Sequence, residues 1–217
     1  MNWFFDVFKN NTQVEKIEEP TIKSKIPIAF IHGANQSSNS WNYIRERLDH
    51  SNEVLLDYSS TQPFYNNLDN MINQIGENPI FVVGHSLGGV YALHLLKHCN
   101  VVGAVSISTP FRGSSAADWA KYLVPQYQLF KDIGRRAKPI LEGDTINIAV
   151  PWKQIVSTTG SVPYLKEDND GVCTIGSMEH RNGDMNCVRV PHTHYEVMCS
   201  NTVVDEIRKS YNAIKQT

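Results

Sequence analysis

The stretch Gly84-His-Ser-Leu-Gly-Gly89 has the residue types and the spacing of a turn that presents a nucleophile. It lies between an apolar run that predicts a buried strand and a segment that predicts a helix, which is the context in which Gly-x-Ser-x-Gly carries meaning. A serine on so tight a turn has a strained backbone, and Gly84 and Gly88 leave room where side chains would otherwise collide. Ser86 is therefore the predicted nucleophile, and we assign no catalytic role to His85.

A serine that attacks a carbonyl needs N–H donors for the negative charge that develops on the carbonyl oxygen. Leu87 comes at the start of the predicted helix, where unpaired N–H groups and the helix dipole favour negative charge, so its N–H is the first predicted donor. The second donor is expected in the loop after an earlier strand. Ile31-His-Gly-Ala34 stands at that place. The N–H of Ala34 is the prediction, and Asn35 is the neighbouring alternative.

The base that activates Ser86 should be a histidine in a loop that can reach over the edge of the sheet. His94 and His98 are too near Ser86 in sequence, on the helix that follows it. His194 lies between a predicted strand and the last predicted helix, so it is the predicted base. His192 is the alternative, because spacing barely separates the two.

An acid that orients the base is expected between Ser86 and that histidine in chain order. Asn169-Asp-Gly-Val172 follows a predicted strand, and its glycine permits a sharp turn that presents the carboxylate of Asp170. Asp168 is the alternative. Asp184 lies nearer the next strand and is predicted to be solvated.

The elements that must position these residues alternate along the chain. Apolar runs predict strands over residues 26–31, 53–58, 79–83, 101–107, 152–158 and 185–190. Helices are predicted over 40–48 with Ser40 as N-cap, over 64–75, over 86–98 with one apolar face, and over 202–214. Such a pattern predicts an α/β fold with a mostly parallel sheet covered by helices on both faces.

The domain organisation predicted from the sequence has three parts. Residues 1–25 form an N-terminal extension, residues 26–217 form one domain, and residues 111–147 are a helical cap inserted into it. Apolar residues of this segment either line an acyl pocket or only pack the cap down: Trp119, Tyr122, Leu123, Tyr127, Leu129 and Phe130.

Charge and composition exclude some classes of protein. Lys and Arg number 20 against 22 for Asp and Glu, a net charge of -2, which argues against a nucleic-acid partner. No apolar run is long enough for a membrane-spanning helix, and no signal peptide is seen, so a cytoplasmic location is predicted. Residues 1–8 are apolar and leave peripheral contact with a membrane surface open.

The four cysteines and eight histidines form no pattern with zinc-ligand spacing, so no metal is predicted. Free thiols are expected, and a bridge between Cys173 and Cys187 is left open.

With these residues assembled, the chain resembles the α/β-hydrolase family, in particular compact microbial triacylglycerol lipases and esterases. The resemblance is carried by four stretches: Phe30-Ile-His-Gly33, Gly84-His-Ser-Leu-Gly-Gly89, Ser108-Thr-Pro-Phe-Arg-Gly-Ser114 and Asn169-Asp-Gly-Val172.

The resemblance implies an α/β-hydrolase fold with a triad of Ser86, Asp170 and His194, and with Ala34 and Leu87 as oxyanion-hole donors. It implies hydrolysis of an acyl ester or lipid without a cofactor. A thioesterase, a phospholipase or lipid deacylase, and a non-catalytic ligand-binding module on the same scaffold are the alternatives. The absence of a secretion signal departs from many of these lipases.

Overall fold

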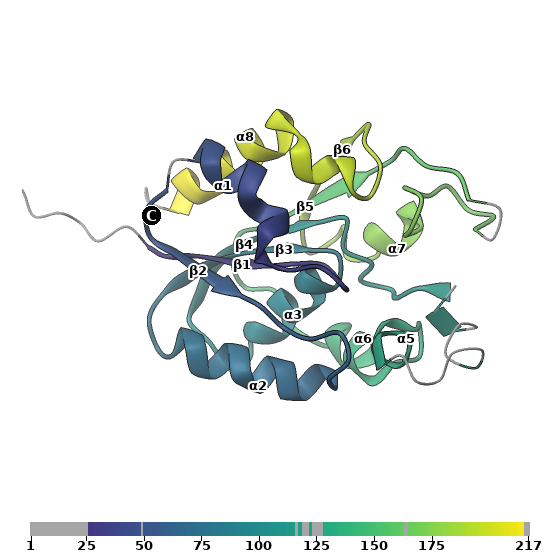
Figure 1. The fold of residues 1–217 in the computed structure, drawn as a ribbon, viewed down its shortest axis with the longest axis horizontal. Coiled ribbons are helices and arrows are strands. Elements are labelled where there is room, and N and C mark those ends of the chain that lie inside the picture. Colours follow the sequence, from purple (N-terminus) through teal and green to yellow (C-terminus); the bar gives the residue numbers. More distant parts are fainter. Residues whose placement is uncertain are drawn as a thin grey trace, which may run out of the picture.

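A six-stranded parallel sheet forms the centre of the molecule (Figure 1). A computed structural model describes residues 26–48, 50–115, 117–118, 122, 128–162 and 165–214. The strands follow the order β2-β1-β3-β4-β5-β6, and each neighbouring pair is parallel. Their bounds are β1 Ile28–Ile31, β2 Glu53–Leu56, β3 Ile80–His85, β4 Val101–Ile107, β5 Trp152–Ser157 and β6 Asn186–Val190.

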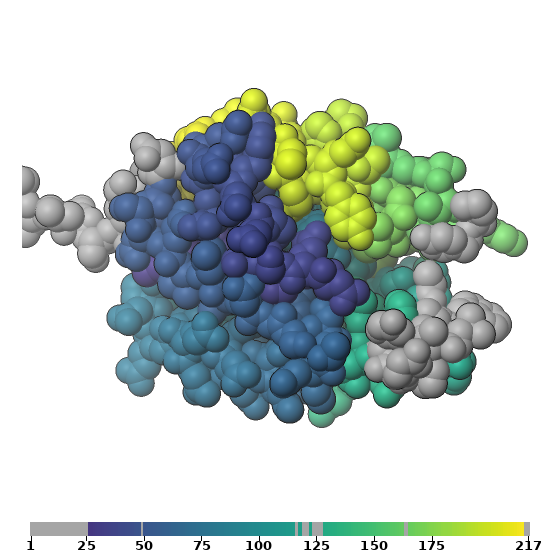
Figure 2. Space-filling model, viewed as in Figure 1, coloured from purple at the N-terminus to yellow at the C-terminus, as the bar shows by residue number. Residues whose placement is uncertain are grey.

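Helices cover both faces of the sheet, as predicted. On one face lie α1 (Asn42–Leu48) and α8 (Asn201–Ile214), and on the other lie α2 (Phe64–Ile75) and α3 (Leu87–Leu95) (Figure 1). Figure 2 shows α8, in yellow, packed against the dark blue segment around α1. Each face has its own apolar core. Because both faces are buried, β1 and residues 80–83 of β3 are continuous apolar runs and do not alternate.

The shorter elements lie at the ends of the strands. They are η1 Ser38–Trp41, α5 Gln128–Ile133, α6 Lys138–Gly143, α7 Ile175–Met178 and η2 Glu196–Cys199. Helices α5 and α6 belong to residues 111–147, of which 116, 119–121 and 123–127 lie outside the described residues. That this segment acts as a cap stays a prediction, as does the role of residues 1–25, which are not described either.

The local reasons for the helices follow from their apolar spacing. In α2 the buried apolar residues Phe64, Leu68, Met71 and Ile75 recur on one side, and the helix closes at Gly76, which has a φ of 65°. Helix α3 differs, because each of its residues is buried. The prediction of one apolar face is wrong there, since α3 lies under α2 and α6 as well as on the sheet.

The start of α1 also differs from the prediction. Ser40 is not an N-cap, because it lies inside the 3-10 turn η1 and donates its hydroxyl hydrogen to the backbone oxygen of Ser37. A serine in a turn satisfies its hydroxyl locally, and from sequence that pattern is indistinguishable from a cap.

None of the helices in the described part of the chain combines the length and apolar character needed to cross a membrane.

Candidate active site

The predicted nucleophile lies on the turn between β3 and α3. Ser86 has a φ of 52° and a ψ of -121°, a conformation that residues other than glycine rarely adopt. Its N–H donates to the oxygen of Ile107 over 2.8 Å, which ties the turn to β4. A Cβ on Gly84 would lie 2.5 Å from the oxygen of Gly88, so the expected need for small residues around the serine is met.

Both predicted oxyanion donors remain available near Ser86. Leu87 is the first residue of α3, and within the described residues neither its N–H nor that of Ala34 has an acceptor. The alternative donor, the N–H of Asn35, is used elsewhere, because it donates to the hydroxyl of Ser60 over 2.8 Å. The geometry therefore favours Ala34 over Asn35.

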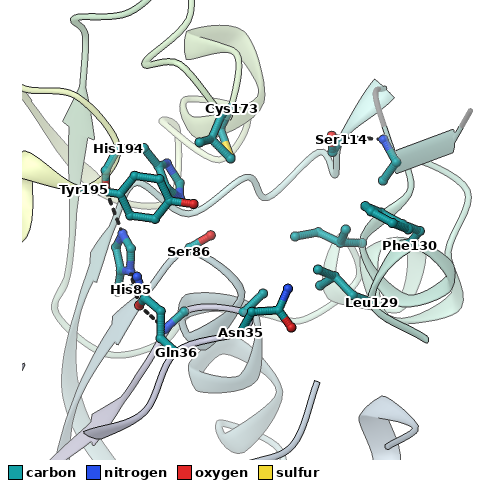
Figure 3. A pocket seen from close by; sticks show the side chains of 15 residues that line it. Asn35, Gln36, His85, Ser86, Ser114, Leu129, Phe130, Cys173, His194 and Tyr195 are labelled. Carbon is teal, nitrogen blue, oxygen red and sulfur yellow. Dashed lines mark hydrogen bonds between the residues drawn. The ribbon is translucent and has the colours of Figure 1, made fainter. Parts of the chain in front are cut away.

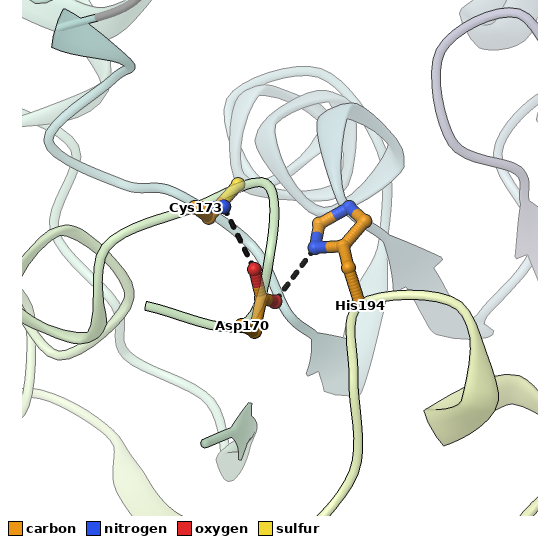
Figure 4. A group of neighbouring side chains, drawn as sticks. All are labelled: Asp170, Cys173 and His194. Atoms are coloured by element: carbon orange, nitrogen blue, oxygen red, sulfur yellow. Dashed lines mark hydrogen bonds and ion pairs between the residues drawn. The ribbon is translucent and has the colours of Figure 1, made fainter. Parts of the chain in front are cut away.

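The predicted acid and base are in direct contact. Nδ1 of His194 donates to Oδ2 of Asp170 over 2.7 Å, and the N–H of His194 donates to the backbone oxygen of Asp170 over 3.0 Å. Both side chains are buried, and the second ring nitrogen of His194 points away from Asp170 (Figure 4). A histidine held in this tautomer has its free nitrogen available to accept a proton.

The alternatives for these two positions lie elsewhere. His192 is half-buried, does not border the pocket around Ser86 and makes only backbone hydrogen bonds. Asp168 is exposed, and exposed Asp184 pairs with Arg181. The contact between acid and base in the described residues is thus made by Asp170 and His194 and not by these alternatives.

The carboxylate of Asp170 is buried and fully hydrogen-bonded. Oδ1 accepts from the N–H groups of Val172 at 3.0 Å and Cys173 at 2.7 Å, and Oδ2 accepts from the hydroxyl of Ser157 at 2.5 Å. Burial by itself would raise the pKa of Asp170. The hydrogen bond from His194 and the positive charge of a protonated His194 ring act against burial, as do the hydrogen bonds from Ser157 and Cys173. Together they outweigh burial and hold the pKa of Asp170 below its usual value.

The acid loop itself depends on residues around Asp170. Asn169 accepts from the N–H of Gly171 and donates to the oxygen of Glu167, which closes a local turn. Gly171 has a φ of 95°, so the sharp turn predicted at this glycine is observed. A Cβ on Gly160 would lie 2.0 Å from the nitrogen of Gly171, so only glycine allows that loop to approach the acid.

His85 lies between the loop of Gln36 and the loop of His194, although the sequence motif suggested no role for it. It is completely buried, Nε2 donates to the backbone oxygen of His194 over 3.0 Å, and Nδ1 lies 3.2 Å from Oε1 of Gln36. Gln36 in turn accepts from the N–H of Gly33. Burial and the nearby charge of His194 lower the pKa of His85 to about 3, so its ring is neutral at ordinary pH.

Ser86 and His194 border the same pocket of about 320 Å³, into which the hydroxyl of Ser86 points (Figure 3). Between these two described side chains there is no hydrogen bond. In unliganded enzymes such catalytic hydrogen bonds are often long and tighten only on binding.

The opposite side of the pocket is mostly apolar, with Ser114 beside the apolar residues (Figure 3). Leu129 and Phe130 of α5 line it, together with Ala117 and Ile133 (Figure 3). Tyr122 is 76% exposed and does not line the pocket. Trp119, Leu123 and Tyr127 lie outside the described residues, so an acyl-pocket role for them stays a prediction.

One set of side chains has the donor types of a metal site. Donor atoms of Asp170, Cys173 and His194 lie within 4.8 Å of one another (Figure 4). Burial raises the pKa of the Cys173 thiol well above its usual value, which opposes the thiolate that a metal would need. A metal there would also replace the hydrogen bond between Asp170 and His194. The four cysteines are free, so Cys173 and Cys187 are not bridged.

Sequence reasoning missed Ser157 and Ser108, which lie behind the carboxylate of Asp170. Single serines at strand ends carry no distinctive spacing. The only signal was that the stretch beginning at Ser108 is one of the four carrying the family resemblance.

Comparison with known proteins adds independent evidence. The model of the alpha/beta hydrolase family matches residues 28–167. Among solved structures, the mature lipase BlEst2 from Bacillus licheniformis aligns with a TM-score of 0.68 at 18% identity, covering 89% of this chain and 94% of that one. No curated protein sequence matches the chain.

Two further structures share the fold. A lipase-esterase related protein from Clostridium acetobutylicum has a TM-score of 0.59 at 20% identity over 87% of this chain and 95% of that one. Phospholipase PlaB from Legionella pneumophila has a TM-score of 0.59 at 13% identity over 70% of this chain and 43% of that one.

Proposed function

Because the chain belongs to the α/β-hydrolase family, we propose that it hydrolyses carboxylic esters by nucleophilic catalysis at Ser86, with Asp170 and His194 completing the triad. The observation that carries this proposal is the pairing of Asp170 with His194, which borders the pocket into which Ser86 points. The order of the three residues along the chain is also that of α/β-hydrolases.

The mechanism follows from the roles that the geometry permits. The free ring nitrogen of His194 takes the hydroxyl proton as Oγ of Ser86 attacks the ester carbonyl. The N–H groups of Leu87 and Ala34 donate to the oxyanion that forms. His194 then gives the proton to the departing alcohol, which leaves an acyl group on Ser86. A water molecule, deprotonated by His194, attacks this acyl-enzyme, and the carboxylic acid leaves as Ser86 regains its proton.

An acyl ester or lipid is the proposed substrate, and the apolar side of the pocket supports it. Leu129, Phe130 and Ile133 offer contacts to an acyl chain rather than to a polar group. The fold is shared with lipases, esterases and a phospholipase, although similarity below 25% identity bears on the fold alone.

The proposal is tested by hydrolysis of p-nitrophenyl esters from acetate to palmitate. We expect activity in the wild type and a fall in kcat of about 10⁴-fold or more in Ser86→Ala. Ser106→Ala is the matched control, because Ser106 is a buried serine of β4 that bonds to Trp152 and not to the site. A fluorophosphonate should label the wild type and Ser106→Ala but not Ser86→Ala.

Other outcomes separate the alternatives. Activity on thioesters but not on esters would make the chain a thioesterase, and labelling without turnover on either would favour a binding module. A cytoplasmic location is also proposed, and fractionation of cells that express the full chain would test it together with any contact with membranes.

A further inference from the structure

Two buried hydroxyl groups stand in line behind the acid. Ser157 ends β5 and Ser108 follows β4, and both are completely buried. Oγ of Ser108 lies 2.6 Å from Oγ of Ser157, which lies 2.5 Å from Oδ2 of Asp170. The sulfur of Met178 is also near Ser157, at 3.8 Å. The contacts thus run without a gap from Ser108 through Ser157 and Asp170 to His194.

The direction of these hydrogen bonds follows from the chemistry of the groups. An ionised carboxylate only accepts, and a hydroxyl has a single hydrogen to donate. Ser157 must therefore give its hydrogen to Asp170, and Ser108 must give its own to Ser157. A hydroxyl that itself accepts a hydrogen bond becomes a better donor, so Ser108 strengthens the bond from Ser157 to the acid.

The backbone of Ser108 indicates that this arrangement has a cost. Its φ is 51°, in the left-handed region that residues with a Cβ seldom adopt. The N–H of Ser108 donates to the oxygen of Ile155 over 2.8 Å, which fixes the turn on β5. Strain of this kind persists where the surroundings overdetermine it, and it clusters at functional sites.

The bond from Ser157 completes the set of donors around Asp170. A carboxylate has about four acceptor positions, and those of Asp170 are filled by Val172, Cys173, Ser157 and His194. With every position occupied, the carboxylate cannot turn without losing a bond. Its Oδ2 is thereby kept facing the ring of His194.

We propose that Ser157, supported by Ser108, is a positioning residue that fixes the Asp170 carboxylate toward His194. The inference rests on the proposed hydrolase function, because the role is exerted through the acid and base. Ser157 does not border the pocket and has no contact with a substrate to make.

The test compares Ser157→Ala and Ser108→Gly with Ser106→Ala, the buried-serine control. Removing one charge-assisted donor should lower kcat about 10- to 100-fold in Ser157→Ala, with KM unchanged. Ser108→Gly should lose less, because Ser157 can still donate. Glycine suits the φ of 51°, so this variant is expected to fold even if Ser157→Ala does not.

A spectroscopic readout separates positioning from packing. The proton on Nδ1 of a histidine bonded to a carboxylate gives a far-downfield proton NMR signal. We expect this signal to move or disappear in Ser157→Ala, to move less in Ser108→Gly, and to stay in place in Ser106→Ala. Ser157→Thr, which keeps the hydroxyl, should retain the wild-type signal and turnover.

The outcomes that overturn the inference differ from those that overturn the function. If folded Ser157→Ala and Ser108→Gly keep the wild-type signal and kcat, the inference is wrong while the hydrolase stands. If the wild type cleaves no ester or thioester, the proposed function is wrong. The NMR comparison still decides whether Ser157 positions Asp170, because it needs no substrate.

Discussion

The two sides of the pocket are built in different ways. The polar wall comprises Gln36, His85, Ser86 and His194, and these residues lie at or just beyond the ends of strands of the sheet. The apolar wall comprises Ala117, Leu129, Phe130 and Ile133, and three of these belong to the six-residue helix α5 outside the sheet. Figure 3 shows the two walls facing each other.

The difference lies in what holds each wall in place. On the polar wall, backbone conformation and hydrogen bonds fix each side chain, and His85 and His194 are almost fully buried. On the apolar wall, Leu129 and Phe130 are half-buried and held by packing. We therefore expect changes on the polar wall and its supports to lower turnover or destabilise the fold. Changes on the apolar wall should alter stability or substrate preference.

Apart from the loss of Ser86 itself, the largest effect is expected from the acid behind the polar wall. Asp170→Asn should lower kcat about 10⁴-fold, because an amide donating to Nδ1 would hold His194 in the wrong tautomer. Its matched control is Asp168→Asn, two residues away and exposed, which should retain the wild-type rate. Steady-state kinetics on a p-nitrophenyl ester makes the comparison. A loss in Asp168→Asn larger than that in Asp170→Asn would identify Asp168 as the acid.

The next effect concerns folding of the turn under Ser86. A Cβ on Gly88 would lie 2.2 Å from the backbone oxygen of Ile31 and 2.6 Å from that of His32. Because backbone atoms cannot move aside cheaply, Gly88→Ala should lower the free energy of unfolding by about 3 kcal/mol or more. Urea denaturation measures it.

The control for this loss is Gly183→Ala, where an added Cβ meets nothing within 4 Å. It should leave stability unchanged or raise it slightly, since alanine restricts the unfolded chain. Equal stability of the two alanine variants would show that the turn can relax, and would remove the steric explanation of the motif.

These two predictions show which part of the site could be read from the sequence. The turn at Ser86 is specified only in part by neighbours in sequence. Gly84 relieves a collision with Gly88 and Gly89, whereas Gly88 leaves room for the backbone of Ile31 and His32, more than 50 residues away. The buried strands and α2 could also be predicted from the sequence, since the spacing of their apolar residues is a local pattern. The parallel sheet followed from the alternation of such strands with helices and is confirmed.

The remainder of the site depends on contacts distant in sequence. The sequence favoured Asp170 over Asp168 only through the glycine that follows Asp170. In the structure Asp170 is buried and bonded to Ser157 and His194, whereas Asp168 is exposed. The sequence left Asn35 as an alternative oxyanion donor. In the structure its N–H donates instead to the hydroxyl of Ser60, 25 residues away. Ser108 and Ser157 became visible only when the sheet brought β4 beside β5.

In the helix that carries the apolar wall, the largest expected effect is on stability. Asp132 of α5 is almost completely buried, and burial raises its pKa to about 6, although Gln128 and the N–H of Phe64 donate to it. The positive charge of Lys131 also favours the charged form of Asp132. In turn, the negative charge of Asp132 helps to raise the pKa values of Tyr65 and Tyr91. Carrying the charge at pH 8 therefore costs stability.

The sign of the pH dependence follows from the raised pKa. The folded state holds the proton of Asp132 more tightly than the unfolded chain, whose pKa is about 4. The contribution of protonated Asp132 to the free energy of unfolding is thus fully present below pH 4, and it is lost as the pH rises to about 6 and beyond. Asp132→Asn should raise the free energy of unfolding by on the order of 2 kcal/mol at pH 8 and change it little at pH 4.

Urea denaturation at the two pH values measures this difference, with Asp69→Asn on the exposed side of α2 as the control. The control should shift neither value. A loss of stability in Asp132→Asn at pH 8 would contradict this expectation. It would mean that the hydrogen bond from the Phe64 N–H, at the start of α2, to the ionised Asp132 carboxylate stabilises the fold by more than burial of that charge destabilises it.

The smallest effect is expected at Phe130, where the apolar wall faces Ser86. Phe130→Ala removes apolar contact area that a long acyl chain would cover and acetate would not reach. KM for an octanoate ester should rise about five-fold, which corresponds to about 1 kcal/mol, while KM for acetate and both kcat values stay near wild type. Leu141→Ala is the control, because Leu141 is 52% exposed on α6 and does not line the pocket. An equal rise for acetate and octanoate would show that Phe130 holds α5 in place instead of contacting the acyl chain. The expectation that the polar wall determines turnover and the apolar wall determines substrate preference would then be wrong.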